Sequence, residues 1–294
     1  MTTPTSAATN PLFRAATLLT LLSVIMGSLV CATESGLACP TWPGCYPGQL
    51  VPGLHLPPWI EFAHRLISGA CLIVLVMAGM SVWRRKDDPW LRWLPWVAVV
   101  GALAAAIFGM SVIFWGIGPW LGALDLVCSL IALLAITLAT VAIERGSFSW
   151  TRTPTTLIGT LAVIDLIVLH ALGILVAGPQ SFTRCMGWPL PGLMHYDGSE
   201  ALQIVRLALA GLAALLIVGL VVVSRGRSVL PWVAFALVVA ELALGFYLAQ
   251  TGLHTGAKAA YSALAVLTLW VTALATARSG VRRLRPEPAG NLAT

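Results

Sequence analysis

The sequence predicts an all-α integral membrane protein with eight transmembrane helices. We expect these to form two repeated four-helix bundles with both termini in the cytoplasm. Of 294 residues, 59% are hydrophobic and 10% are charged, whereas a soluble domain carries about 25% charged residues. The apolar residues gather in continuous runs, and about 20 such residues cross a bilayer as a helix. Continuous rather than alternating runs also exclude an outer-membrane barrel.

The runs define the spans and the organisation of the chain. The expected spans are about 15–33, 59–83, 93–114, 120–143, 155–178, 200–224, 229–251 and 257–277. The expected units are a disordered cytoplasmic tail (1–12), an N-terminal bundle (13–143), a cytoplasmic linker (144–154), a C-terminal bundle (155–278) and a basic cytoplasmic tail (279–294). The run 13–30 is too long for the core of a signal peptide, so we expect it to be retained as the first span.

The basic residues set the orientation. If the spans alternate, 13 of the 17 Lys and Arg residues fall on one side, which also holds both termini. Because cytoplasmic loops are enriched in Lys and Arg, this side is predicted to be cytoplasmic. The net charge of +6 is therefore an orientation signal and not a nucleic-acid footprint. The expected location is the plasma membrane, as a multi-pass protein.

The two halves carry matching residues, which favours a duplication. Cys39-x-x-Trp-Pro in the first long external loop matches Cys185-x-x-Trp-Pro in the second. His64-Arg65 opens the second span as Val205-Arg206 opens the sixth, and Gly109 precedes Asp125 by the same 16 residues that separate Gly245 from Tyr261. Two parallel four-helix repeats commonly hold a site within each bundle or between them.

Ionisable side chains inside spans are costly and indicate function by default. Glu61 and His64 share one helix face, and a neutral imidazole near the outer end of a span can ligate haem iron. Arg65 can pair with a carboxylate such as a haem propionate. The alternative is a structural Glu61–Arg65 ion pair beside a packed histidine.

Further candidates lie at similar depth in other spans. Asp125 and His170 are weaker metal-ligand candidates, each with a structural hydrogen-bonded alternative. His254, Lys258 and Tyr261 share one face of the last span, where Lys258 is expected to reach the interface and Tyr261 is either an interface aromatic or a weak ligand.

The cysteines divide by compartment. Cys39 and Cys45 lie six apart in an external loop, where either a disulfide or a transient redox pair is possible. Cys185 is external without a partner at the matching spacing, and the cysteines in or near spans are expected to be inert: Cys31, Cys71 and Cys128.

Together these features resemble the haem A synthase family of eight-helix membrane proteins. The resemblance covers about 13–278, and its carrying residues are Gly36-Leu-Ala-Cys39-Pro-Thr-Trp-Pro-Gly-Cys45 and then Glu61-Phe-Ala-His64-Arg65. It implies two four-helix bundles with haem sites toward the outer face. It implies oxidation of the C8 methyl of haem O to the formyl of haem A by successive hydroxylations, in cytochrome oxidase biogenesis.

The resemblance also implies site residues and partners. Glu61 is the implied catalytic residue, His64 the implied iron ligand, and Arg65 and Arg206 the implied haem contacts; Cys39 and Cys45 are implied to form a structural or redox-active disulfide. Haem O is the implied substrate and haem b the implied cofactor. The membrane bilayer surrounds the chain, and haem O synthase or cytochrome oxidase subunits are the implied protein partners.

The chain departs from the family at three ligand positions. The family places a histidine in each of spans two, four, six and eight, whereas here Asp125, Val205 and Tyr261 follow His64. His170 and His254 are candidate substitutes. One alternative is a non-catalytic paralogue that binds haem or supports oxidase assembly, and a second is a membrane carrier that uses Asp165 and Glu241.

Overall fold

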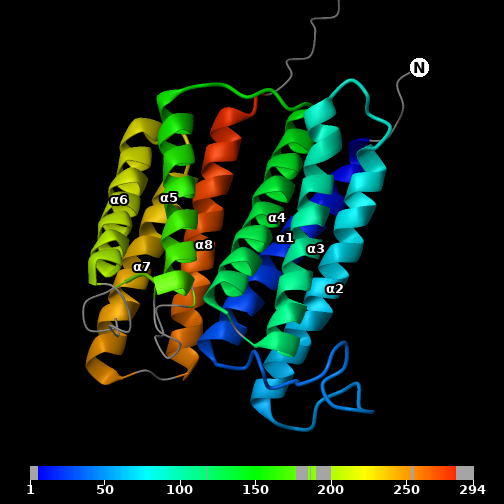
Figure 1. The fold of residues 1–294 in the computed structure, drawn as a ribbon. Helices are drawn as coiled ribbons and strands as arrows, with labels where there is room; N and C mark the ends of the chain where they lie inside the picture. Colours follow the sequence, from blue (N-terminus) through cyan, green and yellow to red (C-terminus); the bar gives the residue numbers. More distant parts are fainter. Residues whose placement is uncertain are drawn as a thin grey trace, which may run out of the picture.

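The structure, a computed structural model, describes residues 6–116, 118–176, 185, 187–189, 200–252 and 255–282. It is built from long helices that run roughly parallel to one another (Figure 1). The helices are α1 (Ser6–Ala32), α2 (Leu56–Val82), α3 (Pro89–Trp115), α4 (Pro119–Arg145), α5 (Pro154–Val176), α6 (Glu200–Ser224), α7 (Leu230–Thr251) and α8 (Thr255–Gly280).

Within the described residues, eight helices are long and apolar enough to cross a membrane, so the predicted multi-pass class is confirmed. The boundaries agree closely with the apolar runs, except at the start of the chain. There α1 begins at Ser6, within the segment 1–12 that was expected to be a disordered tail. Pro11 lies inside this helix.

Local sequence explains where several helices begin. Proline stands in the first turn of α2, α3, α4 and α7, where its missing N–H costs no hydrogen bond. The side chain of Asp88 caps α3 by accepting the backbone N–H of Leu91 at 3.0 Å. The C-terminus of α4 is capped by Gly146, whose φ of 92° favours glycine.

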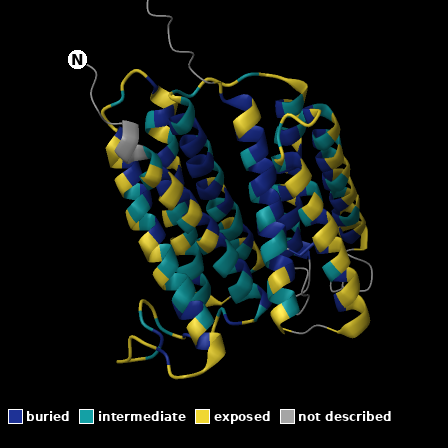
Figure 2. Cartoon of the chain, turned by 180° about the vertical axis from the view of Figure 1, so that it is seen from behind, coloured by how far each residue is buried: buried dark blue, intermediate teal, exposed yellow. Residues whose placement is uncertain are grey.

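The helices pack in the same order in both halves. α1, α2, α3 and α4 form one closed ring of neighbours, and α5, α6, α7 and α8 form another. α1, α4, α5 and α8 make the contacts between the rings. α4 and α8 are the most buried spans, since 61% of the most apolar segment of each is buried. The buried residues face this shared centre in Figure 2. A shared ring order is what a duplication would produce, and the duplication itself stays a prediction.

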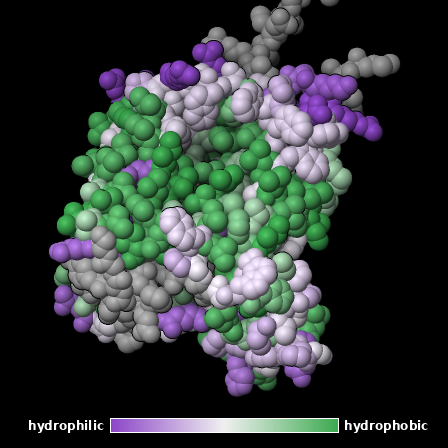
Figure 3. Space-filling view, in the orientation of Figure 1, coloured by the Kyte–Doolittle hydropathy of each residue, from purple (hydrophilic) through white to green (hydrophobic). Residues whose placement is uncertain are grey.

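The surface is banded as a bilayer requires. On the face shown in Figure 3, hydrophobic residues form a broad band, and hydrophilic residues gather toward the two ends of the molecule. α1 begins and α8 ends at one of these ends (Figure 1). Glu144 pairs there with Arg14 at 2.8 Å and with Arg278 at 3.8 Å. That this end is cytoplasmic stays a prediction from the charge distribution.

Candidate functional site

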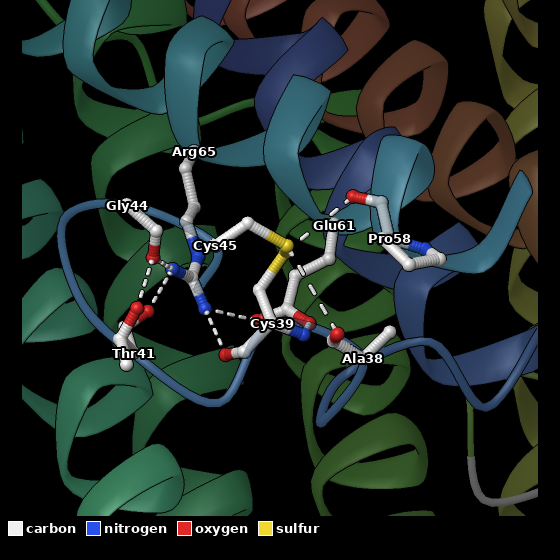
Figure 4. The surroundings of a disulfide bond; sticks show 8 residues. All are labelled: Ala38, Cys39, Thr41, Gly44, Cys45, Pro58, Glu61 and Arg65. Atoms are coloured by element: carbon white, nitrogen blue, oxygen red, sulfur yellow. Dashed lines mark hydrogen bonds and ion pairs between the residues drawn. A yellow bond between two sulfur atoms is a disulfide. The ribbon is translucent and has the colours of Figure 1, made fainter. Parts of the chain in front are cut away.

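The first long loop is fastened to α2 by Arg65. Its guanidinium reaches from the helix into the loop that the Cys39–Cys45 disulfide closes (Figure 4). Nη1 donates to the carbonyls of Thr41 at 2.6 Å and Gly44 at 3.0 Å, and Nη2 donates to the carbonyl of Cys39 at 2.9 Å. A guanidinium can bind several carbonyl oxygens at once because its N–H groups point in different directions within one plane.

Glu61 completes this arrangement. One carboxylate oxygen pairs with Nη2 of Arg65, one helical turn away. The other accepts the backbone N–H of Cys39 at 2.8 Å. Cys39 is thus held on both sides, its N–H by Glu61 and its carbonyl by Arg65. Both side chains are largely buried, and losing either partner would leave an uncompensated charge.

His64 points from α2 toward α1. Its ring lies so close to Gly27 that a Cβ there would be 3.2 Å from Cε1. The hydroxyl of Ser68 is 3.5 Å from Nδ1 and is 2.7 Å from the hydroxyl of Ser23 on α1. His64 is partly accessible rather than sealed. Glu61 and Arg65 therefore serve the loop, while His64, between them in sequence, faces the bundle.

Asp125 on α4 faces α3, since a Cβ on Gly109 would lie 4.0 Å from its Oδ2. It is partly accessible, as His64 is. The hydroxyl of Ser129, one turn further along α4, donates to the carbonyl of Leu126. The site of the N-terminal bundle thus offers one imidazole and one carboxylate on different helices.

The C-terminal bundle holds a second polar cluster that sequence reasoning did not assemble. Each helix contributes one ionisable residue, and residues 187–189 of the second long loop lie against them. Arg206 on α6 donates to the carbonyl of Gly187 at 3.2 Å, and the Tyr261 hydroxyl on α8 donates to the carbonyl of Trp188 at 3.0 Å. His170 on α5 lies beside Arg206, and Glu241 on α7 lies beside Tyr261 and Trp188.

This C-terminal cluster is closed. Its members are each exposed by 2% or less: His170, Trp188, Arg206, Glu241 and Tyr261. Within the described part of the chain, neither ring nitrogen of His170 and neither carboxylate oxygen of Glu241 has a hydrogen-bond partner. Buried polar atoms without partners are rare and costly, so these are high-energy positions.

The haem b cofactor implied by the resemblance does not fit this bundle. Val205, at the position of a family ligand, is 44% exposed and so lies outside the bundle core. The hydroxyl of Tyr261 is engaged by Trp188. Among the described residues, the imidazole of His170 has no hydrogen-bond partner, but it is only 1% exposed, so a macrocycle would reach it only if the surrounding side chains moved. We therefore derive no chemistry from a haem in this half.

A second disulfide corrects the cysteine analysis. Cys31, expected to be inert, is joined to Cys185, expected to lack a partner. The bond links the end of α1 to the second loop, and the Ser28 hydroxyl supports it by donating to the carbonyl of Cys185 at 3.2 Å. The missed signal was that Cys31 ends the first span on the side that also holds Cys185. Cys71 and Cys128 are free.

The other candidates are more dispersed. Lys258 contacts Glu34 at 4.0 Å, a weak link between the two halves. Asp165 is buried on α5, and its Oδ2 has no partner among the described residues. His254 lies outside the described residues. No group of three or more His, Cys, Asp or Glu side chains that could hold a metal ion occurs in the portion the structure describes.

Fold and geometry together define a class of protein. It is an eight-helix membrane protein with a polar site held against a loop in one bundle and a buried polar cluster in the other. No family model matches the chain. Among characterised proteins, the haem A synthase of Lysinibacillus sphaericus is 35% identical over 127 residues, 42% of this chain and 41% of that protein. That of Geobacillus kaustophilus is 30% identical over 190 residues, 60% of this chain and 59% of that protein. That of Exiguobacterium sibiricum is 27% identical over 200 residues, 65% of this chain and 67% of that protein.

The chain is thus a distant homologue of the haem A synthases, consistent with a divergent member of that family and with a multi-pass protein of the cytoplasmic membrane. The matches span 41% and 59% of the length of the first two relatives.

Proposed function

We propose that this chain is a haem A synthase-like oxidoreductase that acts on haem O in its N-terminal bundle. The reaction is oxidation of the C8 methyl toward the formyl of haem A. The observation that carries the proposal is the combined site on α2. There a partly accessible His64 stands between two residues that fix the first loop, Glu61 and Arg65.

Each residue has a distinct part in this proposal. His64 is the proposed ligand of the substrate iron, and the Ser68 hydroxyl, 3.5 Å from its Nδ1, is the side chain that would orient the ring. Glu61 is the proposed proton-transfer residue, held in place by the Cys39 N–H. Arg65 positions the loop and Glu61. A haem propionate would have to displace one of its present partners or use its Nε–H.

A second candidate is a non-catalytic haem-binding or oxidase-assembly paralogue. One observation favours it: the residues of the buried C-terminal cluster do not fit the second haem that the family resemblance implies. Such a chain would keep substrate haem at His64 without turning it over, and would associate with haem O synthase or oxidase subunits. The carrier alternative gains little, because α5 and α7, which hold Asp165 and Glu241, are unbroken helices.

The test is expression of the full chain in a bacterial host that lacks haem A synthase but makes haem O. Membranes are extracted and the haems are identified by chromatography and mass spectrometry. Haem A or a hydroxylated haem O intermediate, lost in Glu61→Gln with haem O still bound, is the expected result. Bound haem O with no oxidised product in the parent chain would overturn the oxidoreductase proposal and establish the second candidate.

A further inference from the structure

A groove lined by tryptophan lies between α2 and α3, at the end of the molecule opposite the first loop. Its lining residues are Met80, Trp83, Trp93, Trp96 and Val100, and its volume is about 560 Å³. α2 and α3 run side by side at one edge of the molecule (Figure 1). The groove faces outward, since Met80, Trp93 and Val100 are between 51% and 64% exposed.

A glycine shapes the floor of this groove. A Cβ on Gly79 of α2 would lie 2.9 Å from Cε2 of Trp96, so only glycine lets that indole lie flat against the helix. Trp83 meets both other indoles edge to face, with ring centroids 5.5 Å from Trp93 and 5.7 Å from Trp96. These contacts hold the aromatic walls in a defined arrangement.

A cation is built into the end of the groove. The guanidinium carbon of Arg92 lies 4.2 Å from the ring centroid of Trp83 and 5.4 Å from that of Trp93. Its Nε is buried and has no hydrogen-bond partner among the residues that the structure describes, and the same holds for the buried Nε1 of Trp96. Stacking fixes the cation without neutralising it.

The surrounding charge has the same sign. Arg84, Arg85 and Lys86 follow α2 directly. Of the two acidic residues after them, Asp88 is buried and is used to cap Leu91 and to accept the backbone N–H of Phe148 at 2.6 Å. Asp87 is exposed, but the four cations Arg84, Arg85, Lys86 and Arg92 outnumber it, so the mouth of the groove is positive. Aromatic and basic residues of this kind mark the boundary between hydrocarbon and headgroups.

We propose that this groove is a binding site for an anionic phospholipid. An acyl chain lies along Met80, Trp96 and Val100, and the phosphate meets Arg92 and the basic residues after α2. Charge complementarity selects this occupant over a second copy of the chain, whose groove would bring the same positive charge. The site is independent of the proposed haem chemistry.

The experiment measures lipid retained by the purified full-length protein. The chain is exchanged into nanodiscs of equal parts phosphatidylglycerol and phosphatidylcholine, released, and examined by native mass spectrometry. We expect the parent chain to retain phosphatidylglycerol. We expect Arg92→Gln to retain about fivefold less phosphatidylglycerol, which is equivalent to about 1 kcal/mol for one basic contact near the surface. Arg227→Gln is the matched control, because Arg227 is an exposed cation in the α6–α7 connection and is expected to change nothing.

A second variant tests the apolar part without touching charge. Val100→Trp fills the groove and is expected to reduce phosphatidylglycerol retention, with the unfolding temperature recorded for every variant. Equal retention of the two lipids by the parent chain would overturn the proposal, as would retention unchanged in both Arg92→Gln and Val100→Trp. A dimer cross-linked through Trp93→Cys in the same nanodiscs would assign the groove to a second copy instead.

Discussion

The two bundles hold their long loops in the same way but differ in the residues that lie beneath those loops. Arg65 of α2 and Arg206 of α6 both donate to carbonyls of their own long loop. Beside Arg65 stands a partly accessible histidine, whereas beside Arg206 stands Val205, turned outward. An arginine that binds the loop is thus present in both halves, whereas a histidine precedes it only in the N-terminal half. Holding the loop therefore does not require a histidine at the preceding position.

The bundles also differ in how their polar groups are satisfied. In the N-terminal bundle, the carboxylate of Glu61 is paired on both oxygens. In the C-terminal bundle, Glu241 and His170 are fully buried, with no hydrogen-bond partner in the described part of the chain. Side chains this deeply buried are reached by a macrocycle only if their neighbours move. We therefore expect haem to depend on the N-terminal half alone.

The largest expected effect comes from the two histidines. His64→Ala is expected to lower the haem retained by the purified protein by at least about tenfold, because it removes the proposed iron ligand. His170→Ala is the matched control in the other bundle and is expected to leave haem content unchanged. Haem per protein is measured by the pyridine haemochrome spectrum, with folding checked by thermal unfolding. The assignment of haem to the N-terminal half fails if His170→Ala is the variant that loses haem.

The next comparison is between the two disulfides. Cys31–Cys185 closes a separation of 154 residues, and Cys39–Cys45 one of 6. Loop-closure entropy gives about 5 kcal/mol for the long loop and about 2 kcal/mol for the short one. Cys31→Ser is therefore expected to lower the unfolding temperature more than Cys39→Ser does, as measured by scanning fluorimetry in detergent. Equal decreases in the unfolding temperature would mean that the Cys31–Cys185 disulfide constrains the unfolded chain no more than the Cys39–Cys45 disulfide does.

The contrast between these disulfides shows what the sequence could and could not predict. The eight spans were predictable because a bilayer requires continuous apolar runs. The local pair Cys39 and Cys45 could be suspected from its short spacing and the family resemblance. Cys31 and Cys185 could not be paired by spacing, since their proximity depends on how α1 packs near the second loop.

The same limit applies to the polar sites. Glu61 and Arg65 are one helical turn apart, so their ion pair was among the expected alternatives. The cluster around Trp188 joins four helices and a loop, and no spacing reveals it. Glu241 in particular has no sequence neighbour that indicates its surroundings. The early start of α1 at Ser6 was missed because its first turns are polar and contain Pro11.

A smaller effect is expected at the contact between α1 and α2. A Cβ at position 27 would stand 3.2 Å from Cε1 of His64, closer than ordinary contact, so Gly27→Ala must displace the imidazole. We expect haem retention to fall about fivefold, equivalent to about 1 kcal/mol of overpacking. Gly69→Ala on α2 is the control, because a Cβ there meets nothing within 4 Å. If Gly27→Ala and Gly69→Ala retain equal amounts of haem, the position of the His64 ring beside Gly27 does not matter for haem binding.

The smallest expected effect comes from placing histidines in the C-terminal bundle, and it tests most strictly whether the two bundles differ in their ability to bind haem. Val205→His with Tyr261→His restores the family histidines to α6 and α8, yet we expect no second haem. Val205 is 44% exposed, so a histidine there starts outside the bundle core, and Tyr261 is packed beneath Trp188. Asp125→His is the positive control, because Asp125 is partly accessible and a histidine there adds a second imidazole to the N-terminal half.

The readout is haem per protein together with the electron paramagnetic resonance of the ferric state. Asp125→His is expected to keep one haem and to give a low-spin, bis-imidazole signal, whereas the double variant is expected to keep the parent spectrum. A second haem in the double variant would show that the loop at Trp188 yields to a macrocycle. The closed C-terminal cluster would then be one state of a haem site, and the residues at positions 205 and 261, rather than the packing, would decide whether this half binds haem.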